Sequence, residues 1–177
     1  MAKPILFVLG AIPAIFAILI AVPLVTQTEI PVIAVNSDDV IEFEYTKHQL
    51  QTVSFGVTER LGAVQTEILT IDNDGKVRYQ LIQDGAPQPD KKSTIKLENV
   101  TRITALVKET GFMKIPSESF PIRDGITEYQ KSTLKITLNG EITQIHWPEQ
   151  NVTEKFVPPI ITAVERELDA VIKQIIE

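Results

Sequence analysis

The sequence predicts an α+β fold, in which an N-terminal transmembrane helix is followed by an antiparallel sheet of hairpins packed with two amphipathic helices. Three observations predict it: an uncharged stretch at positions 4–25, two pairs of alternating strand-like segments joined by glycine-containing turns, and two segments with apolar residues at helical spacing. The helices and the strands need one another to bury their apolar faces. A chain of 177 residues allows one ordinary domain plus an appendage.

The N-terminal stretch predicts where the protein resides. Residues 4–25 carry no charge, and a helix of that length matches the roughly 30 Å hydrocarbon core of a bilayer. Lys3 is the only charge before the stretch, and no Lys or Arg follows until Lys47, so the N-terminus is expected in the cytoplasm and the rest outside. We therefore predict a single-pass protein of the cell membrane that contacts the lipid bilayer through residues 4–25. The alternative is cleavage near Ala34 and secretion.

This reasoning divides the chain into three parts. They are residues 1–25 as the membrane anchor or an uncleaved signal, 26–50 as a stalk or the first strands, and 51–177 as an extracytoplasmic α+β domain.

Two hairpins are predicted in the third part. In the first, residues 67–72 and 76–82 flank a turn with Gly75 in the left-handed conformation, which pairs Ile71 with Val77 and Leu69 with Tyr79. In the second, residues 133–138 and 141–147 flank Asn139-Gly140, a type I′ signature. That turn pairs Leu138 with Glu141, Ile136 with Thr143 and Leu134 with Ile145.

Two amphipathic helices complete the domain. One runs from about Asn99, at the N-cap position, to Thr110 and stops at Gly111; the other opens at Pro159, which suits a first helical position. The apolar stripes are Val100, Ile103, Leu106 and Val107 in the first helix, and Ile160, Ile161, Val164, Leu168, Val171, Ile172 and Ile175 in the second.

Composition excludes several kinds of chemistry. The chain has no cysteine, which rules out disulfides, thiolate nucleophiles and cysteine-based metal sites. A net charge of −6 argues against a nucleic-acid partner. The two histidines, His48 and His146, lack the companions that a metal site needs, and no serine lies in a nucleophile motif. We therefore assign no catalytic, cofactor-binding or metal-binding residue and expect no cofactor.

Two kinds of candidate site remain. Asn99 and Asn151 each begin an Asn-x-Thr glycosylation acceptor.

The second kind of site is a contact surface. The segment from residue 116 to 130 is a predicted loop with unusual apolar content, and exposed apolar residues on a loop mark a contact surface. The candidate protein-binding residues are Phe120, Ile122, Arg123, Asp124 and Tyr129. The alternative is that Phe120 and Ile122 are buried in the core.

Between Val53 and Ile172 the chain carries a series of short motifs that mark turns, helix ends and strand ends. They are Phe55-Gly56 or Leu61-Gly62, the Ile71–Val77 turn, Gly111-Phe112, Ile115-Pro116, Asp124, Tyr129, the Leu138-Asn139-Gly140 turn, Trp147 and Pro159. This order resembles the emfourin-type, or protealysin-inhibitor-like, small exported α+β domains. The resemblance implies inhibition of thermolysin-like metalloproteases through protein contact, and it carries over no inhibitory residue. The chain departs from that pattern in its N-terminal segment and in having single glycines where the family opens on a Gly-Gly-rich stretch.

These observations predict a non-catalytic, membrane-anchored extracytoplasmic domain that binds an unidentified protein, such as an accessory subunit of a membrane complex. The alternatives are an inhibitor of thermolysin-like metalloproteases and an uncharacterised exported hydrolase.

Overall fold

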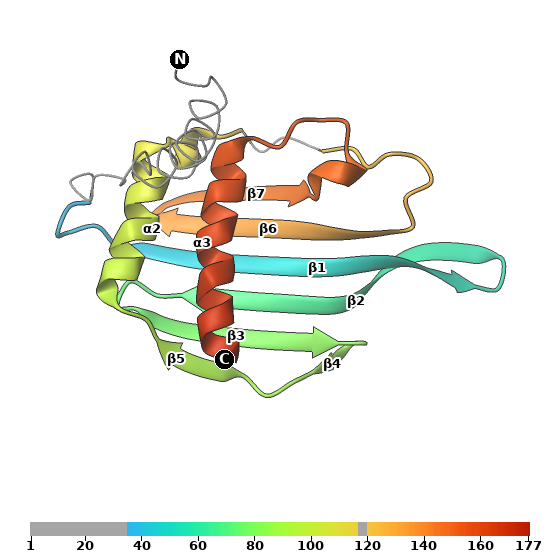
Figure 1. The fold of residues 1–177 in the computed structure, drawn as a ribbon, viewed down its shortest axis with the longest axis horizontal. Coiled ribbons are helices and arrows are strands. Elements are labelled where there is room, and N and C mark those ends of the chain that lie inside the picture. The colour runs from blue at the N-terminus through green and yellow to red at the C-terminus, as the bar shows by residue number, and fades with distance from the viewer. Residues whose placement is uncertain (1–34, 117–119) are drawn as a thin grey trace, which may run out of the picture. The chain divides into compact units, whose positions relative to one another are not determined.

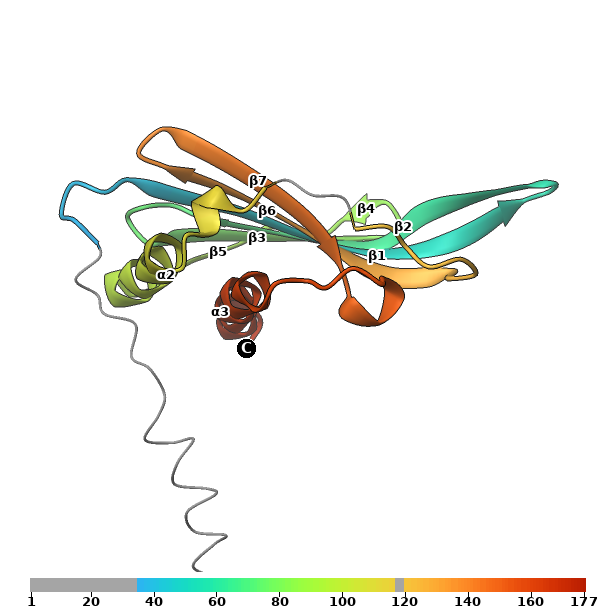
Figure 2. The ribbon, with the colours of Figure 1, turned by 90° about the horizontal axis from the view of Figure 1, so that it is seen from above.

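The computed structural model describes residues 35–116 and 120–177, which lie in one compact unit, Pro31–Glu177. Seven strands form a single antiparallel sheet, and two helices lie on one of its faces (Figure 1 and Figure 2). We name this the covered face and the opposite one the open face. The elements in chain order are β1 (Ile41–Phe55), β2 (Thr58–Ile71), β3 (Lys76–Gln83), β4 (Ala86–Pro87), β5 (Lys91–Thr94), α2 (Leu97–Glu109), the 3₁₀ helix η2 (Phe112–Lys114), β6 (Glu128–Leu138), β7 (Glu141–Pro148), the 3₁₀ helix η3 (Gln150–Val152) and α3 (Pro159–Ile176).

The predicted fold class, an α+β domain that follows an N-terminal transmembrane helix, is wrong with respect to the transmembrane helix. No helix within residues 35–116 and 120–177 is long and apolar enough to cross a membrane. The predicted span at residues 4–25 and the alternative cleavage point at Ala34 lie outside the described residues. The fold of the described part is an antiparallel sheet with two helices.

The registers of both predicted hairpins are confirmed. Ile71 pairs with Val77 and Leu69 with Tyr79, and Gly75 adopts the left-handed conformation with φ of 81°. In the second hairpin the pairs Leu138–Glu141, Ile136–Thr143 and Leu134–Ile145 are all present. The turn residues Asn139 and Gly140 have φ of 51° and 85°, as a type I′ turn requires.

The two hairpins are not separate units, because β1 lies between them and pairs with both β2 and β6. The strand order is β4-β3-β2-β1-β6-β7, with β5 also pairing with β3. Alternation along β1 places Ile41, Phe43 and Tyr45 in the core on the covered face. The suggested division between residues 50 and 51 falls inside this strand.

The far end of β1 has a single neighbour. Its pairing with β6 ends at Gln51 and Glu128, whereas its pairing with β2 continues to Phe55 and Thr58. The register shifts between Gln49 and Leu50 on β1, as in a β-bulge. Beyond Gln51 the two strands project past the rest of the sheet, as Figure 1 shows. We call residues 52–61 the β1–β2 arm.

Both helices cover the sheet with the predicted stripes, except that Ile160 and Ile175 at the two ends of the α3 stripe are only half-buried. Val100, Ile103, Leu106 and Val107 are buried in α2, and Ile161, Val164, Leu168, Val171 and Ile172 are buried in α3. Helix α3 begins at Pro159, as predicted. The predicted N-cap at Asn99 is wrong, because α2 begins at Leu97 with Lys96 at the N-cap position, and Asn99 lies within the first turn. Gly111 follows α2 with φ of 68°, which ends the helix.

Asp39 joins the start of β1 to two distant elements. Its carboxylate accepts hydrogen bonds from Lys108 Nζ of α2 at 2.5 Å and from Asn139 Nδ2 of the β6–β7 turn at 2.8 Å. Its side chain is only 5% exposed. The bonds from Lys108 and then Asn139 lower the pKa of Asp39 from its ordinary 3.8 to about 2.

This lowered pKa predicts a loss of stability in acid. Because the folded-state pKa lies below the unfolded value, the Asp39 contribution is complete above about pH 5 and is lost as the pH falls from about 4 to 2. We expect a contribution on the order of 1–2 kcal/mol to the free energy of unfolding. Urea unfolding of the wild type and of Asp39→Asn at pH 7, 4 and 2.5 measures it. The difference between the two proteins should shrink towards acid, and a constant difference would contradict the assignment.

Candidate functional site

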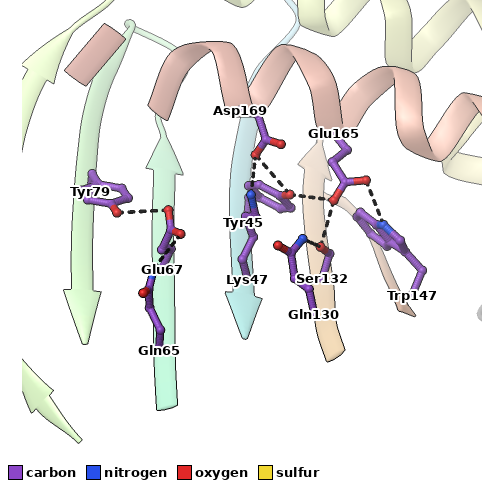
Figure 3. Close-up of polar contacts among 10 residues, drawn as sticks. All are labelled: Tyr45, Lys47, Gln65, Glu67, Tyr79, Gln130, Ser132, Trp147, Glu165 and Asp169. Carbon is purple, nitrogen blue, oxygen red and sulfur yellow. Dashed lines mark hydrogen bonds and ion pairs between the residues drawn. The ribbon is translucent and has the colours of Figure 1, made fainter. Parts of the chain in front are cut away.

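Glu165 on α3 accepts hydrogen bonds from three side chains of the sheet (Figure 3). The donors are the hydroxyl of Tyr45 on β1 at 3.0 Å, the hydroxyl of Ser132 on β6 at 2.9 Å and the indole Nε1 of Trp147 on β7 at 3.2 Å. Ser132 and Trp147 are register partners, and all three donors point to the covered face. Each is at most 2% exposed, so these bonds replace water that the buried groups cannot reach.

Asp169 lies one helical turn beyond Glu165 and faces the same side of the sheet. Its Oδ1 accepts from Lys47 Nζ at 3.1 Å and, at 3.4 Å, from the hydroxyl of Tyr45. The side chains of Lys47 and Asp169 are 17% and 34% exposed, which makes this ion pair partly protected from solvent. We call Tyr45, Lys47, Ser132, Trp147, Glu165 and Asp169 the polar cluster.

The electrostatics of the polar cluster keep Tyr45 protonated. Burial, followed by the negative charges of Glu165 and Asp169, raises the pKa of the Tyr45 phenol far above its ordinary value of 10.0. The ring of Tyr45 also stacks on that of Trp147, with centroids 6.4 Å apart and planes 15° apart. Tyr45 is therefore a permanent hydrogen-bond donor that ties the sheet to α3, and its phenolate is not accessible as a base.

A second polar pair lies farther across the covered face. Glu67 on β2 accepts a hydrogen bond from the Tyr79 hydroxyl of β3 at 3.0 Å and one from Gln65 at 3.1 Å. Burial and the nearby charge of Glu67 raise the pKa of Tyr79 above its ordinary value. Figure 3 shows this pair beside the polar cluster. The covered face of the sheet therefore carries buried polar side chains beside its apolar core.

A cavity of about 540 Å³ opens beside the polar cluster. Its apolar walls include Trp147, Pro148, Phe156, Val157 and Pro159, and its polar walls include Lys47, Gln130, Ser132, Glu149, Glu165 and Asp169. Phe156 is 68% exposed, although it is one of the largest apolar side chains at the cavity. Three carboxylates and one ammonium group line it, so the cavity carries a net negative charge.

The predicted contact loop does not enter the polar cluster but packs on the segment that follows β7. Ile122 forms an isolated bridge with Thr153, and the Arg123 backbone N–H donates to the carbonyl of Val152 at 2.9 Å. The Arg123 guanidinium donates to the carbonyls of Asn151 at 3.1 Å and Thr153 at 3.2 Å. The loop therefore supports residues 151–153, close in sequence to the cavity wall at Phe156.

The other predicted residues of this loop have varied surroundings. Phe120 is half-buried and lies under Lys155 Nζ, 5.5 Å from its ring centroid. Asp124 is exposed, whereas Tyr129 is buried within β6.

The two glycosylation candidates differ in accessibility. Asn99 is half-buried in the first turn of α2, and Asn151 is exposed in η3.

Sequence reasoning missed the polar cluster because only the apolar stripe of the last helix was expected to contact the sheet, and Glu165 and Asp169 do not belong to that stripe. The spacing of four residues was visible, and so was the position of both carboxylates beside the buried stripe of Val164 and Leu168. A single sequence does not show which polar side chains of β1 and β6 lie opposite them. The long-range register of the sheet supplies that information.

No protein-family model matches the chain, and no curated protein matches it. The resemblance to emfourin-type domains therefore stays a prediction, and so does the inhibition of thermolysin-like metalloproteases that it implies.

Proposed function

We propose that the protein is a non-catalytic binding domain that holds an extended segment of another protein in the cavity beside α3. The observation that carries this proposal is the exposed Phe156 at the mouth of a cavity with apolar walls and three carboxylates. Exposed aromatic side chains beside a concave surface are typical of protein contact sites. The predicted export and the predicted contact of residues 4–25 with a lipid bilayer belong to the same proposal, with secretion after cleavage near Ala34 as the alternative.

The charge of the cavity favours a basic partner. Among the described residues that line it, Glu149, Glu165 and Asp169 outnumber the one cation, Lys47. A segment that presents an Arg or Lys between apolar residues would complement both its charge and its walls. An acidic segment would be repelled.

The hydrogen bonds of the polar cluster support a binding role over a catalytic one. Both oxygens of Glu165 are occupied by donors, Asp169 is paired with Lys47, and Tyr45 remains protonated. General acid–base catalysis needs a group that gains or releases a proton near neutral pH and is open to substrate. These side chains instead hold α3 in place and so fix the shape of the cavity.

Peptide binding to the full-length chain tests the proposal. Matched nine-residue peptides would carry alternating apolar residues with either Arg or Glu at the centre, and Trp147, the only tryptophan, reports binding by fluorescence. We expect the Arg peptides to bind with dissociation constants on the order of 10–100 µM and the Glu peptides at least about tenfold more weakly. Phe156→Ser should weaken the Arg peptide about tenfold or more.

Val57→Ser is the matched control, because Val57 is also an exposed apolar residue but lies at the tip of the β1–β2 arm. It should leave peptide affinity unchanged. Equal affinity for Arg and Glu peptides, or equal loss in both variants, would contradict the proposed site.

A further inference from the structure

The two edges of the sheet differ in how well they are protected against pairing with another strand. At one edge lie β4 and β5, which have only two and four residues. This edge carries Pro87, Pro89, Lys91 and Lys92, and short strands, prolines and lysines are the features that keep edges from pairing.

The other edge is β7, which has eight residues and a proline only at its last position, Pro148. Its residues Ile142–Trp147 include no Lys, Arg, Asp, Glu or Pro, and they are rich in β-branched and aromatic side chains. The pairing with β6 runs without a register shift from Leu138–Glu141 to Lys131–Pro148. Within the described ranges 35–116 and 120–177, no strand pairs with the outer side of β7.

The hydrogen-bonding groups at this edge follow from the register. In a two-residue hairpin the pair next to the turn, Leu138–Glu141, exchanges backbone hydrogen bonds, and every second pair after it does the same. The backbone N–H and C=O groups of Ile142, Gln144 and His146 therefore point away from β6. No backbone hydrogen bond from another described segment reaches them. Their side chains lie on the open face, where Ile142 is 61% exposed.

We propose that β7 pairs in an antiparallel manner with β7 of a second copy of this chain, around a two-fold axis at Gln144. In that register Gln144 lies opposite its equivalent, Ile142 opposite the second copy's His146, and Glu141 opposite the second copy's Trp147. The pairing uses the whole strand and forms one continuous sheet across both copies.

The chemistry of the strand favours a second copy over an unrelated strand. Glu141 is the only formal charge in residues 141–147, and in this register it lies opposite Trp147 rather than another charged residue, so no like charges are paired across the strands. An isologous contact requires such self-complementarity. The 3₁₀ helix η2 does not block the edge, because its contact with β7 is made by the Thr143 side chain on the covered face, whose Oγ1 donates to the carbonyl of Met113 at 3.1 Å. The pairing does not depend on the proposed peptide cavity.

A cysteine substitution tests the register directly, because the chain has no cysteine of its own. Directly opposite residues of a hydrogen-bonded antiparallel pair lie about 5.5 Å apart between Cα atoms, within the range that a disulfide spans. Full-length Gln144→Cys should therefore form a covalent dimer under mild oxidation. The matched control is Ser93→Cys, an exposed position on the opposite edge strand β5, which should form no covalent dimer under the same conditions.

Sedimentation of the full-length chain over about 1–200 µM measures the unmodified association. We expect reversible dimers, and we expect Ile142→Lys to weaken them about tenfold or more by placing a charge at the contact. The Trp147 emission of that variant verifies that it is folded. A wild-type chain that stays monomeric throughout this range would overturn the proposal. Crosslinking of Gln144→Cys no greater than that of Ser93→Cys would overturn it as well.

Discussion

Replacing Glu165 with leucine is expected to lower the free energy of unfolding by about 3–5 kcal/mol, because it leaves three buried donors without their acceptor. Tyr45, Ser132 and Trp147 all donate to this one carboxylate. A buried donor that loses its partner costs about 1–3 kcal/mol, and Tyr45 keeps only its longer bond to Asp169. Urea unfolding followed by the fluorescence of Trp147 measures the loss, and the same indole reports the change in its surroundings.

Glu167→Leu provides the matched control on the same helix. Glu167 pairs with Arg102 at 2.6 Å on the surface, where the Arg102 side chain is 53% exposed. Surface ion pairs contribute about 0–1 kcal/mol, so this variant should unfold close to the wild type. Equal losses in the two variants would show that the polar cluster is not what holds α3 on the sheet.

Gly75→Ala is expected to lower the free energy of unfolding by about 2–4 kcal/mol, because two separate penalties add up: one from the backbone conformation and one from a steric clash of the new methyl group. The backbone of Gly75 has φ of 81°, which costs an L-residue about 1–2 kcal/mol. A Cβ at this position would also lie 2.6 Å from the carbonyl oxygen of Ile95, which is backbone and cannot rotate away. The Ile95 N–H donates to the Gly75 carbonyl at 2.9 Å, so relief of the clash would disturb that bond.

Gly140→Ala separates the two penalties. Gly140 has a similar φ of 85°, but no atom lies within 4 Å of the position that its Cβ would take. This variant should lose only the conformational part, about 1–2 kcal/mol. Thermal or urea unfolding of both variants gives the comparison. If Gly140→Ala is as destabilising as Gly75→Ala, the contact with Ile95 contributes nothing.

The local parts of this fold could be predicted from the sequence. Asn139-Gly140 and Gly75 specify turns whose loop lengths fix the pairing of the adjoining strands, and both registers are confirmed. Pro159 and the apolar stripe behind it specify α3 in the same way. In these segments the relevant interactions lie within a few residues of one another.

Long-range pairing could not be predicted in the same way. The strand β1 carries Glu42, Glu44, Thr46 and His48 on its open face, so its polarity suggested a stalk as readily as the centre of a sheet. Its position follows from partners far away in sequence, such as Phe43 with Ile71 and with Ile136. The polar cluster has the same origin, since Tyr45 and Glu165 are 120 positions apart.

The contacts within the β1–β2 arm contribute little to the free energy that stabilises the core of the domain. The last β6-side contact of β1 is the hydrogen bond from the Thr52 N–H to the carbonyl of Thr127 at 2.7 Å. From Val53 to Phe55 β1 pairs with β2 alone, and Val57 at the tip is fully exposed. The ladder there is a marginal two-stranded ribbon, which can open and close while Phe43 and its neighbours remain packed. Insertions and substitutions in the arm therefore carry little thermodynamic penalty for the rest of the domain, and this is the part of the protein whose length and sequence are most free to diverge.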